Sequence, residues 1–319
     1  MIIYVKGNLF TSPVKVLVNT VNTVGVMGKG IAKTFKDIYP EMFSQYQRLC
    51  EKKQFRIGNL WLYKTPHKWI LNFPTKQHWR QPSRPEYIEA GLKKFISTYS
   101  SQGITGIAFP KLGCGNGELD WESVVKPLMT RYLGGLSIDI FIYESGKEAF
   151  PPEHKDIEVM NEWLRSEPRA LAFSEMWTDL CNLIGSGLNL TTLDNTTNFN
   201  IIVKSQPECG LCIQVESKSV WKTIVQSLFK LVSSRWRIIG PGNVFVPQET
   251  MLDLWQNVRT YGFCIPRIMP GGLDALAPYV IALMSRLEYM KPVMLSTPAQ
   301  QKSGTGEAGL QLFAFPVTK

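Results

Sequence analysis

The chain has 319 residues, of which 44% are hydrophobic and 19% charged, and it carries a formal net charge of +9. A chain of this length has room for two domains, and this composition is typical of globular proteins that bury their own cores. Its longest apolar runs fall well short of the roughly 18 residues that a membrane-spanning helix needs, and its N-terminus reads as a strand rather than a signal peptide. We therefore expect a cytoplasmic protein without membrane contact.

The six cysteines are scattered along the chain, which fits a reducing compartment better than a disulfide framework. Cys209 and Cys212 form a lone C-x2-C pair. A structural zinc site needs a second pair of ligands, and the three histidines are not spaced to supply it. We therefore expect neither a metal nor a cofactor.

The positive charge is unevenly distributed. Residues 1–150 carry a net charge of +9, whereas the rest of the chain carries a net charge of zero. Such an excess favours a polyanionic partner or substrate for the first half of the chain. Taken alone, the charge is explained more simply by a solvated basic face that has no partner.

Strands and helices alternate through the first half of the chain. Apolar patterns predict strands at residues 1–7, 15–20, 58–63, 69–73, 104–110 and 137–143. They predict helices after residue 30, interrupted at Pro40, and at residues 87–98 and 121–132. This alternation indicates an α/β domain over residues 1–150, with a sheet that is mostly parallel in its middle.

A charged stretch at 144–154, with two adjacent prolines, is the predicted linker. Beyond it we expect a separate α+β domain over 155–319, without a catalytic signature. The predicted helices lie at 156–165, 219–232, 248–261 and 273–289. The predicted strands lie at 200–205, 211–215, 236–239 and 312–317, and a flexible polar loop is expected at 300–309.

Two glycine-rich loops follow buried strands and open helices. The first contains Gly25, Gly28 and Gly30, with Lys29 at its tip, and the second runs over 111–121. A strand, a glycine loop and a helix N-terminus together form an anion site, because unpaired backbone N–H groups point at the ligand. The spacing matches neither the P-loop nor the dinucleotide-binding pattern. A glycine-rich turn in an ordinary α/β domain is the alternative.

Five short segments, in this order, resemble the macrodomain family. They are KGNLF (6–10), VNTVN (18–22), VMGKGIA (26–32), FPTK (73–76) and GCGNG (113–117), the last followed by LDW (119–121). Their order and spacing are similar to those of the branch that cleaves terminal ADP-ribose, and closest to DarG-type antitoxins, which remove ADP-ribose from thymidine in single-stranded DNA. The resemblance covers residues 1–145 only. It implies a three-layer fold, with a mixed sheet flanked by helices.

The resemblance also implies an ADP-ribose site. The two glycine loops would hold the pyrophosphate, Asn22 would lie near the distal ribose and Asn8 near the adenine. Asn8 departs from the family, which usually has aspartate there, so charge assistance to the adenine is lost. The predicted ligand-binding residues are Asn8, Leu9, Asn19, Asn22, Met27, Gly28, Lys29, Gly30, Ile31, Gly113, Cys114, Gly115, Asn116 and Gly117.

Lys76 stands where the resembling branch has a catalytic lysine. Cleavage at an anomeric carbon passes through an oxocarbenium-like state with a departing anion. A neutral amine can act there as a nucleophile, and a charged one can stabilise the leaving group. Asp120 is the second predicted catalytic residue, because its carboxylate could orient water. The alternatives are a surface lysine and a helix N-cap aspartate.

Trp79, Arg80 and Arg84 follow Lys76 in a basic loop. Aromatic stacking combined with guanidinium charge is typical of single-stranded nucleic acid binding, although a tryptophan packed on the sheet edge fits equally well. This loop and the uneven charge favour a nucleic-acid substrate over a modified protein. With the resemblance, we expect a hydrolase that removes ADP-ribose from DNA as antitoxin to a DNA ADP-ribosyltransferase, and a C-terminal domain that binds this transferase or adds substrate contacts. The alternatives are a non-catalytic ADP-ribose reader and a hydrolase of ADP-ribosyl-glutamate on proteins.

Overall fold

The computed structural model describes residues 1–144, 152–216, 235–296 and 306–314. The chain forms two compact units, Met1–Trp163 and Leu164–Lys319. The division falls inside helix α5 (Ile157–Ser166), later in the chain than the linker predicted at 144–154. None of the helices in the described ranges has the length and hydropathy that crossing a membrane requires.

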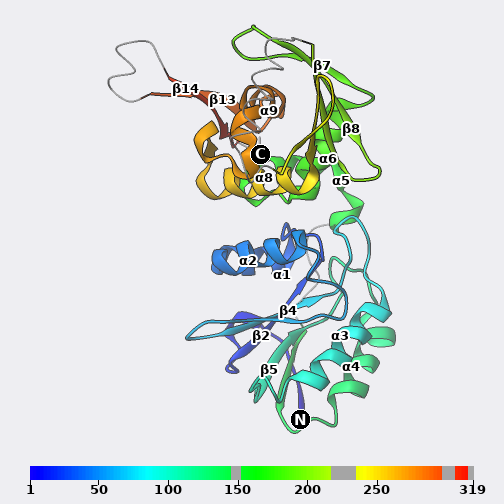
Figure 1. Ribbon diagram of the computed structural model, residues 1–319. Helices are drawn as coiled ribbons and strands as arrows, with labels where there is room; N and C mark the ends of the chain where they lie inside the picture. The colour runs from blue at the N-terminus through cyan, green and yellow to red at the C-terminus, as the bar shows by residue number, and fades with distance from the viewer. Residues whose placement is uncertain (145–151, 217–234, 297–305, 315–319) are drawn as a thin grey trace. The chain divides into compact units, whose positions relative to one another are not determined.

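The first unit is a three-layer structure built on one six-stranded sheet. Helices α1 and α2 cover one face of this sheet and helices α3 and α4 cover the other (Figure 1). Its strands are β1 (Ile2–Val5), β2 (Val16–Val21), β3 (Trp61–Lys64), β4 (Trp69–Pro74), β5 (Gly106–Pro110) and β6 (Asp139–Tyr143). Its α-helices are α1 (Gly30–Ile38), α2 (Pro40–Glu51), α3 (Pro85–Thr98), α4 (Lys126–Leu133) and the first part of α5. Its short helical turns are η1 (Leu9–Thr11), η2 (Trp121–Val125) and η3 (Glu153–Lys155).

The sheet is mixed, as expected. Its strand order is β1-β6-β5-β2-β4-β3. Every neighbouring pair is parallel except β3 and β4, which are antiparallel and place β3 at an edge. Because β5, β2 and β4 are adjacent and parallel, their carboxyl ends meet at one edge of the sheet. The connections that leave these three ends are therefore brought together.

Strand alternation divides the sheet residues between two cores. Val16 and Val18 point into the core shared with α3 and α4, which also contains Phe73, Phe95 and Phe109. The strand residues that alternate with these, such as Leu17 between Val16 and Val18, point to the opposite face of the sheet, since successive side chains of a strand alternate. Burial on both faces explains why these strands are near-continuous apolar runs.

Over its described residues, the second unit is an α+β structure with two antiparallel sheets and several helices. One sheet has the order β10-β11-β9-β8-β7 and the other β12-β14-β13. The strands are β7 (Leu188–Thr191), β8 (Asn198–Lys204), β9 (Gly210–Val215), β10 (Arg237–Gly240), β11 (Asn243–Pro247), β12 (Phe263–Cys264), β13 (Met290–Leu295) and β14 (Glu307–Leu312). The helices beyond α5 are η4 (Pro168–Ala170), α6 (Phe173–Ile184), α8 (Gln248–Tyr261), η5 (Pro266–Ile268), η6 (Pro270–Leu276) and α9 (Ala277–Met284).

The sequence predicted this unit less well than the first. The helix at 248–261 is confirmed as α8, but the helix predicted at 273–289 ends at Met284, and the chain then enters β13. The polar loop predicted at 300–309 overlaps the start of β14, and α6 was not predicted. The helix predicted at 219–232 lies outside the described residues.

Candidate active site

A cavity of about 490 Å³ lies at the carboxyl edge of the central strands of the first unit. Pro152 and Glu153 line it together with three connections that leave the strand ends. These connections are the loop between β2 and α1 (loop 1), the turn after β4 that carries Lys76, and the loop between β5 and η2 (loop 2). In parallel sheets, ligands bind at such an edge because loops from neighbouring strands converge there.

The pairing of the sheet itself opens the cavity. Strands β2 and β5 are paired only at Val16 with Ile107 and at Leu17 with Ala108. Strands β2 and β4, in contrast, stay paired as far as Val21 and Pro74. Beyond Leu17 the ladder on the β5 side therefore ends, and the space between the two strand ends is available to loops 1 and 2.

Asn22 organises loop 1. It is buried, its Nδ2 donates to the carbonyl of Val26 (2.7 Å), and its Oδ1 accepts from the backbone N–H groups of Val24 (3.1 Å) and Val26 (3.2 Å). The Tyr46 hydroxyl, from α2, donates to the Asn22 carbonyl (2.8 Å) and lies 3.0 Å from its Oδ1. Burial is the main cause that raises the pKa of Tyr46 well above its usual value, so this hydroxyl remains a donor. Loop 1 is thus held by a buried polar network.

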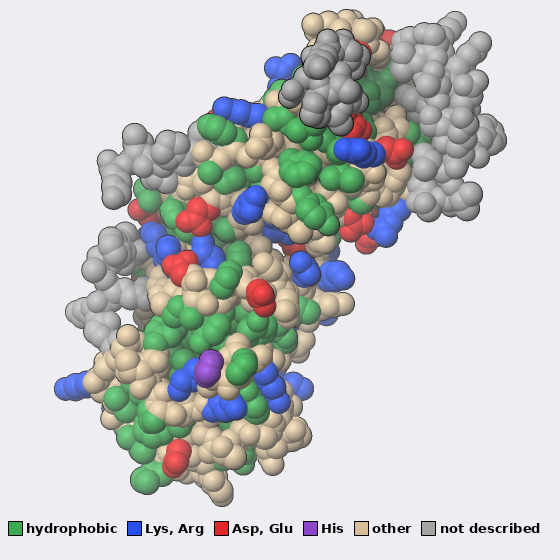
Figure 2. Space-filling model, turned by 90° about the vertical axis from the view of Figure 1, so that its left-hand side faces the viewer, with side chains coloured by type: hydrophobic (Ala, Val, Ile, Leu, Met, Phe, Trp, Pro, Cys, Tyr) green, Lys and Arg blue, Asp and Glu red, His purple; other side chains and the backbone are tan. Residues whose placement is uncertain are grey.

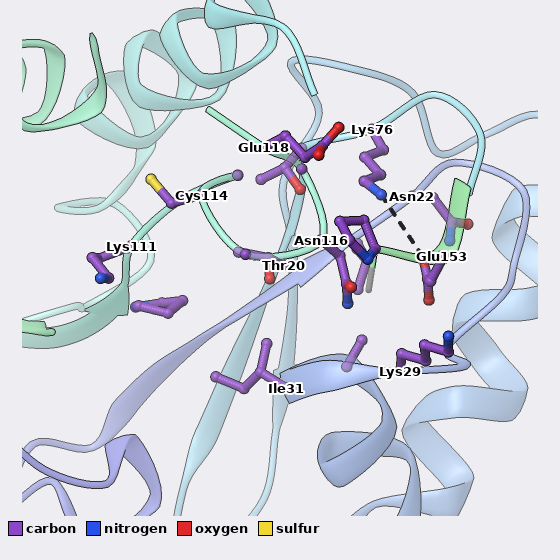
Figure 3. Close-up of a pocket in the computed structure, with 18 of the residues that line it drawn as sticks. Thr20, Asn22, Lys29, Ile31, Lys76, Lys111, Cys114, Asn116, Glu118 and Glu153 are labelled. Carbon is purple, nitrogen blue, oxygen red and sulfur yellow. Dashed lines mark ion pairs between the residues drawn. The ribbon is translucent and has the colours of Figure 1, made fainter. Parts of the chain in front are cut away.

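The N-terminus of α1 faces the cavity. Lys29 precedes the helix in extended backbone and makes no side-chain cap. The first N–H groups of a helix have no partner within the helix and carry its positive dipole end. Ala32 lines the cavity, as do Lys29 and Ile31 (Figure 3), so this end can receive an anionic group.

Loop 2 requires glycine at two positions. Gly113 has a φ of +68°, in the left-handed region that glycine tolerates best. A Cβ on Gly117 would lie 2.2 Å from Ser83 Oγ and 2.3 Å from the Gly113 carbonyl oxygen. The Gly113 carbonyl already accepts from the Leu119 N–H (2.9 Å). Only glycine at position 117 therefore lets the loop close on itself at the cavity wall.

Lys76 lies at one end of the cavity, in the turn that follows β4. Its residue is only 5% exposed, and its Nζ is 3.8 Å from the Glu153 Oε2 (Figure 3). Lys111 and Cys114 lie at the opposite side in the same view. Lys76 is enclosed and its side chain is directed into the cavity. The structure therefore excludes the alternative interpretation that Lys76 is an exposed surface lysine.

The cavity wall contains most of the predicted loop residues. Lys29, Ile31, Asn22 and the whole of the second cluster line it, the last being Gly113, Cys114, Gly115, Asn116 and Gly117. Burial raises the pKa of the Cys114 thiol to about 12, so this thiol is protonated at neutral pH and is a poor nucleophile.

Six of the predicted ligand-binding residues, all within the part of the chain that the structure describes, do not line this cavity. They are Asn8, Leu9, Asn19, Met27, Gly28 and Gly30. Asn8 caps η1, since its Oδ1 accepts from the Phe10 N–H (3.0 Å). Asn19 is fully buried and donates to Asn72 Oδ1 (3.0 Å). These two amides have structural bonds here, which their sequence context did not reveal.

Asp120 caps a helical turn and does not line the cavity. Its Oδ1 accepts from the Ser123 backbone N–H (2.7 Å) and hydroxyl (2.6 Å) at the start of η2. These hydrogen bonds, first the one to the side chain, lower the pKa of Asp120. The geometry supports the N-cap alternative and not the catalytic role predicted for this residue.

One of the three predicted nucleic-acid contacts, Trp79, needs a correction, and Arg80 and Arg84 stay predictions. Trp79 is fully buried, so it packs inside the unit and offers no face on which a base can stack. Arg80 lies over the Trp79 ring, 4.1 Å from its centroid, and donates to Asn161 Oδ1 (2.9 Å). Arg84 precedes α3 and lies 5.9 Å from the Tyr87 ring centroid. A buried indole and an exposed one look alike in a sequence.

Sequence reasoning missed two acidic residues of the cavity, Glu118 and Glu153. Glu118 follows the glycine cluster directly, and its bonds with Lys155 and His154 lower its pKa. Glu153 lies within the stretch predicted as a linker, so nothing local marked it. Among the described residues, no group of three or more His, Cys, Asp and Glu side chains is placed to hold a metal ion.

Comparison with known proteins places the cavity in a family. The Macro domain family model matches residues 18–128. The DNA ADP-ribosyl glycohydrolase of Thermus aquaticus is 43% identical over 148 residues, which are 45% of this chain and 41% of that protein. A DNA ADP-ribosyl transferase-DNA ADP-ribosyl glycohydrolase fusion protein of Thermosipho africanus is 40% identical over 158 residues, 44% of this chain and 40% of that protein.

A shorter relative is matched over almost all of its length. The human ADP-ribose glycohydrolase OARD1 is 30% identical over 143 residues, which are 44% of this chain and 90% of that protein. The first two relatives, in contrast, are spanned only over about two fifths of their length. The residues that the family model matches include most of β2, the strands β4 and β5 and both glycine loops, which build the cavity described above. By its first unit, the chain belongs to the macrodomain family.

Proposed function

We propose that the first unit is a glycohydrolase that removes ADP-ribose from thymidine in single-stranded DNA, with water as the only co-reactant. The observation that carries this proposal is the buried Lys76 ammonium at the end of a cavity bounded by two glycine loops. An anion cradle alone would suit a binding module. An enclosed amine at its end supplies a group that can take part in bond cleavage.

The cavity fits the chemistry of ADP-ribose. The unpaired N–H groups at the start of α1 and the backbone of loop 2 are suited to the diphosphate. Asn116 adds an amide to the lining, with which a ribose hydroxyl group can be hydrogen-bonded (Figure 3). The Asn22 amide is already bonded within loop 1 and holds the cavity wall. In this orientation the distal ribose reaches the end of the cavity where Lys76 lies.

Hydrolysis would break the bond between the anomeric carbon of the distal ribose and the base. The electron pair of that bond leaves with the base, a water molecule supplies the hydroxyl group that the sugar gains, and the remaining proton of that water returns to the base. Positive charge develops on the sugar ring and negative charge on the leaving base. The Lys76 ammonium, in a site largely removed from water, can stabilise this leaving group.

The preference for DNA rests on two observations. The similar proteins from Thermus aquaticus and Thermosipho africanus are named as DNA ADP-ribosyl glycohydrolases. The net charge of +9 falls within residues 1–150, and on the face in view Lys and Arg side chains are spread over the first unit (Figure 2). Electrostatic attraction to a phosphate backbone would follow.

We further propose that the chain is the antitoxin of a DNA ADP-ribosyltransferase, and that its second unit contacts this transferase. In the Thermosipho africanus relative, a DNA ADP-ribosyl transferase and a glycohydrolase are named as parts of one fusion protein. A glycohydrolase that reverses the modification is useful where the transferase is present. Co-expression with such a transferase, followed by co-purification of the two chains, tests this part.

The decisive experiment compares Lys76→Ala with Lys94→Ala in the full chain. Lys94 is an exposed lysine on α3 and serves as the matched control. We expect Lys76→Ala to lower kcat on an oligonucleotide carrying ADP-ribosyl-thymidine by at least about 100-fold, the loss typical for removal of one electrostatic or acid–base group. Binding of free ADP-ribose, measured by calorimetry, should be retained by both variants.

The wild-type chain separates the alternatives. Binding of ADP-ribose without turnover of any substrate would identify a reader and refute the enzyme. Turnover of an ADP-ribosyl-glutamate protein but not of the oligonucleotide would place the substrate on protein. Equal kcat for Lys76→Ala and Lys94→Ala would exclude Lys76 from the chemistry.

A further inference from the structure

The Lys76 end of the cavity is completed by residues beyond the match to the family model, which ends at residue 128. Glu153, in η3, is 6% exposed and lines the same cavity. Its Oε2 lies 3.8 Å from Lys76 Nζ, and Figure 3 shows the two side chains directed at one another. The ion pair therefore joins the turn after β4 to a segment much later in the chain.

Both charges of this pair are removed from water. A buried ammonium or carboxylate without a counter-charge is strongly disfavoured, and the attraction between them compensates only when each is held close to the other. Glu153 therefore does two things for Lys76. It offsets the cost of burying the ammonium, and it fixes the direction in which the flexible lysine side chain points.

The backbone that carries Glu153 is anchored to loop 2. We call residues 152–163 the covering segment. His154 Nε2 and Glu118 Oε2 are 2.7 Å apart, and Lys155 forms an ion pair with the same Glu118 carboxylate. Glu118 follows the glycine cluster of loop 2 and also lines the cavity. The two residues that directly follow Glu153 are thus both held by one cavity residue, Glu118.

The covering segment is also anchored to loop 1 and α1. A Cβ on Gly28 would lie 2.6 Å from Met160 Cε, so the Met160 methyl group occupies the space above this glycine. The ammonium of Lys36, in α1, lies 4.6 Å from the Trp163 ring centroid. Contacts with loops 1 and 2 and with α1 hold the segment in place, and its first two residues, Pro152 and Glu153, line the cavity.

We propose that Glu153 is a positioning residue that holds Lys76 Nζ in the geometry required for cleavage, and that the start of the covering segment, Pro152 and Glu153, is part of the active site. This inference rests on the proposed function, because it assigns Glu153 a role in that reaction. It adds that the macrodomain residues matched by the family model do not contain the whole site.

The test uses Glu153→Gln, Glu153→Asp and a control variant in the full chain. Glu158→Gln is the control, because Glu158 is an exposed acid of the same segment. Glutamine keeps the shape of Glu153 and removes its charge, and aspartate keeps the charge but withdraws it by one methylene group. Each variant is assayed for kcat and KM on the ADP-ribosylated oligonucleotide, for binding of free ADP-ribose by calorimetry, and for melting temperature.

We expect Glu153→Gln to lower kcat by about 100-fold, because a misplacement of the order of 1 Å has this effect on a reacting group. The dissociation constant of ADP-ribose should change by less than about threefold, since the diphosphate cradle is untouched. Glu153→Asp should restore part of the lost kcat, and Glu158→Gln should equal the wild type. This split between kcat and binding distinguishes positioning from a merely structural role.

Three results would overturn the inference. A wild-type kcat in Glu153→Gln would show that Lys76 needs no partner. A higher kcat or tighter binding would mean that the carboxylate competes with the substrate. A parallel loss of kcat, binding and melting temperature in both Glu153 variants would make Glu153 a packing residue.

If Glu153→Gln does not fold, Glu153→Asp decides, and a kcat within about twofold of the wild type would refute positioning. Failure of the proposed function is recognised separately. A wild-type chain without turnover would refute the glycohydrolase itself and the inference with it, whereas an active wild type with an unaffected Glu153→Gln variant refutes only the inference.

Discussion

Substitution of Gly117 by alanine should damage the cavity in a way that the structure quantifies. The new Cβ would lie 2.2 Å from Ser83 Oγ and 2.3 Å from the Gly113 carbonyl oxygen. The serine hydroxyl can rotate away, but the carbonyl is backbone and is bound by the Leu119 N–H (2.9 Å). Relief of the clash therefore requires loop 2 to shift.

The cost combines two terms. Overpacking of this kind costs about 1–3 kcal/mol, and the loss of the Gly113–Leu119 hydrogen bond costs about 1 kcal/mol more. We expect Gly117→Ala to lower the free energy of unfolding by about 2–4 kcal/mol. Because loop 2 forms a wall of the cavity, we also expect the dissociation constant of ADP-ribose to rise at least about tenfold.

Urea unfolding and calorimetric titration with ADP-ribose measure the two effects. Gly135→Ala is the matched control, because a Cβ there meets nothing within 4 Å. It should bind ADP-ribose as the wild type does. Equal stability and equal binding in the two alanine variants would refute the reasoning, since the steric argument separates these glycines completely.

Two further predictions concern residues that hold the site. Asp120→Ala should lower the melting temperature and leave kcat unchanged. Asp120→Asn should keep the melting temperature of the wild type, because asparagine also caps helices. A loss of kcat in both variants at an unchanged melting temperature would contradict the capping role. Tyr46→Phe should lower the free energy of unfolding by about 1–3 kcal/mol, because it removes a buried donor to Asn22. Denaturant unfolding measures this change, and Tyr63→Phe, on the half-exposed edge strand β3, is the control. Equal free energies of unfolding for the two variants would show that the network does not depend on the Tyr46 hydroxyl.

The sequence predicted the first unit well because its signals are local. Apolar runs such as the one at 15–20 mark strands that are buried on both faces, and the glycines at 113–117 mark a loop that needs them sterically. Lys76 was placed by resemblance, and the structure adds that it is buried. The convergence of the loops follows from strand order, which the sequence implies only through the alternation of strands and helices.

The failures have a common physical cause. Trp79 was assigned to a nucleic-acid surface, but whether an indole is packed or exposed depends on distant residues that cover it. Asp120 forms the N-cap of η2, which the sequence offered as the alternative to its predicted catalytic role. Glu153 could not be found at all, because its partner is 77 positions away in the chain and its own surroundings resemble a linker. Long-range pairing leaves no mark in a short stretch of sequence.

The covering segment determines where this chain can be cut. A fragment that stops near residue 145, as the family resemblance would suggest, keeps both glycine loops and Lys76 but loses Met160 from above Gly28 and the acid that faces Lys76. If such a fragment had weak activity, the loss could be attributed wrongly to the absence of the second unit. Dissection of the two units should therefore leave every residue up to Trp163 with the first one.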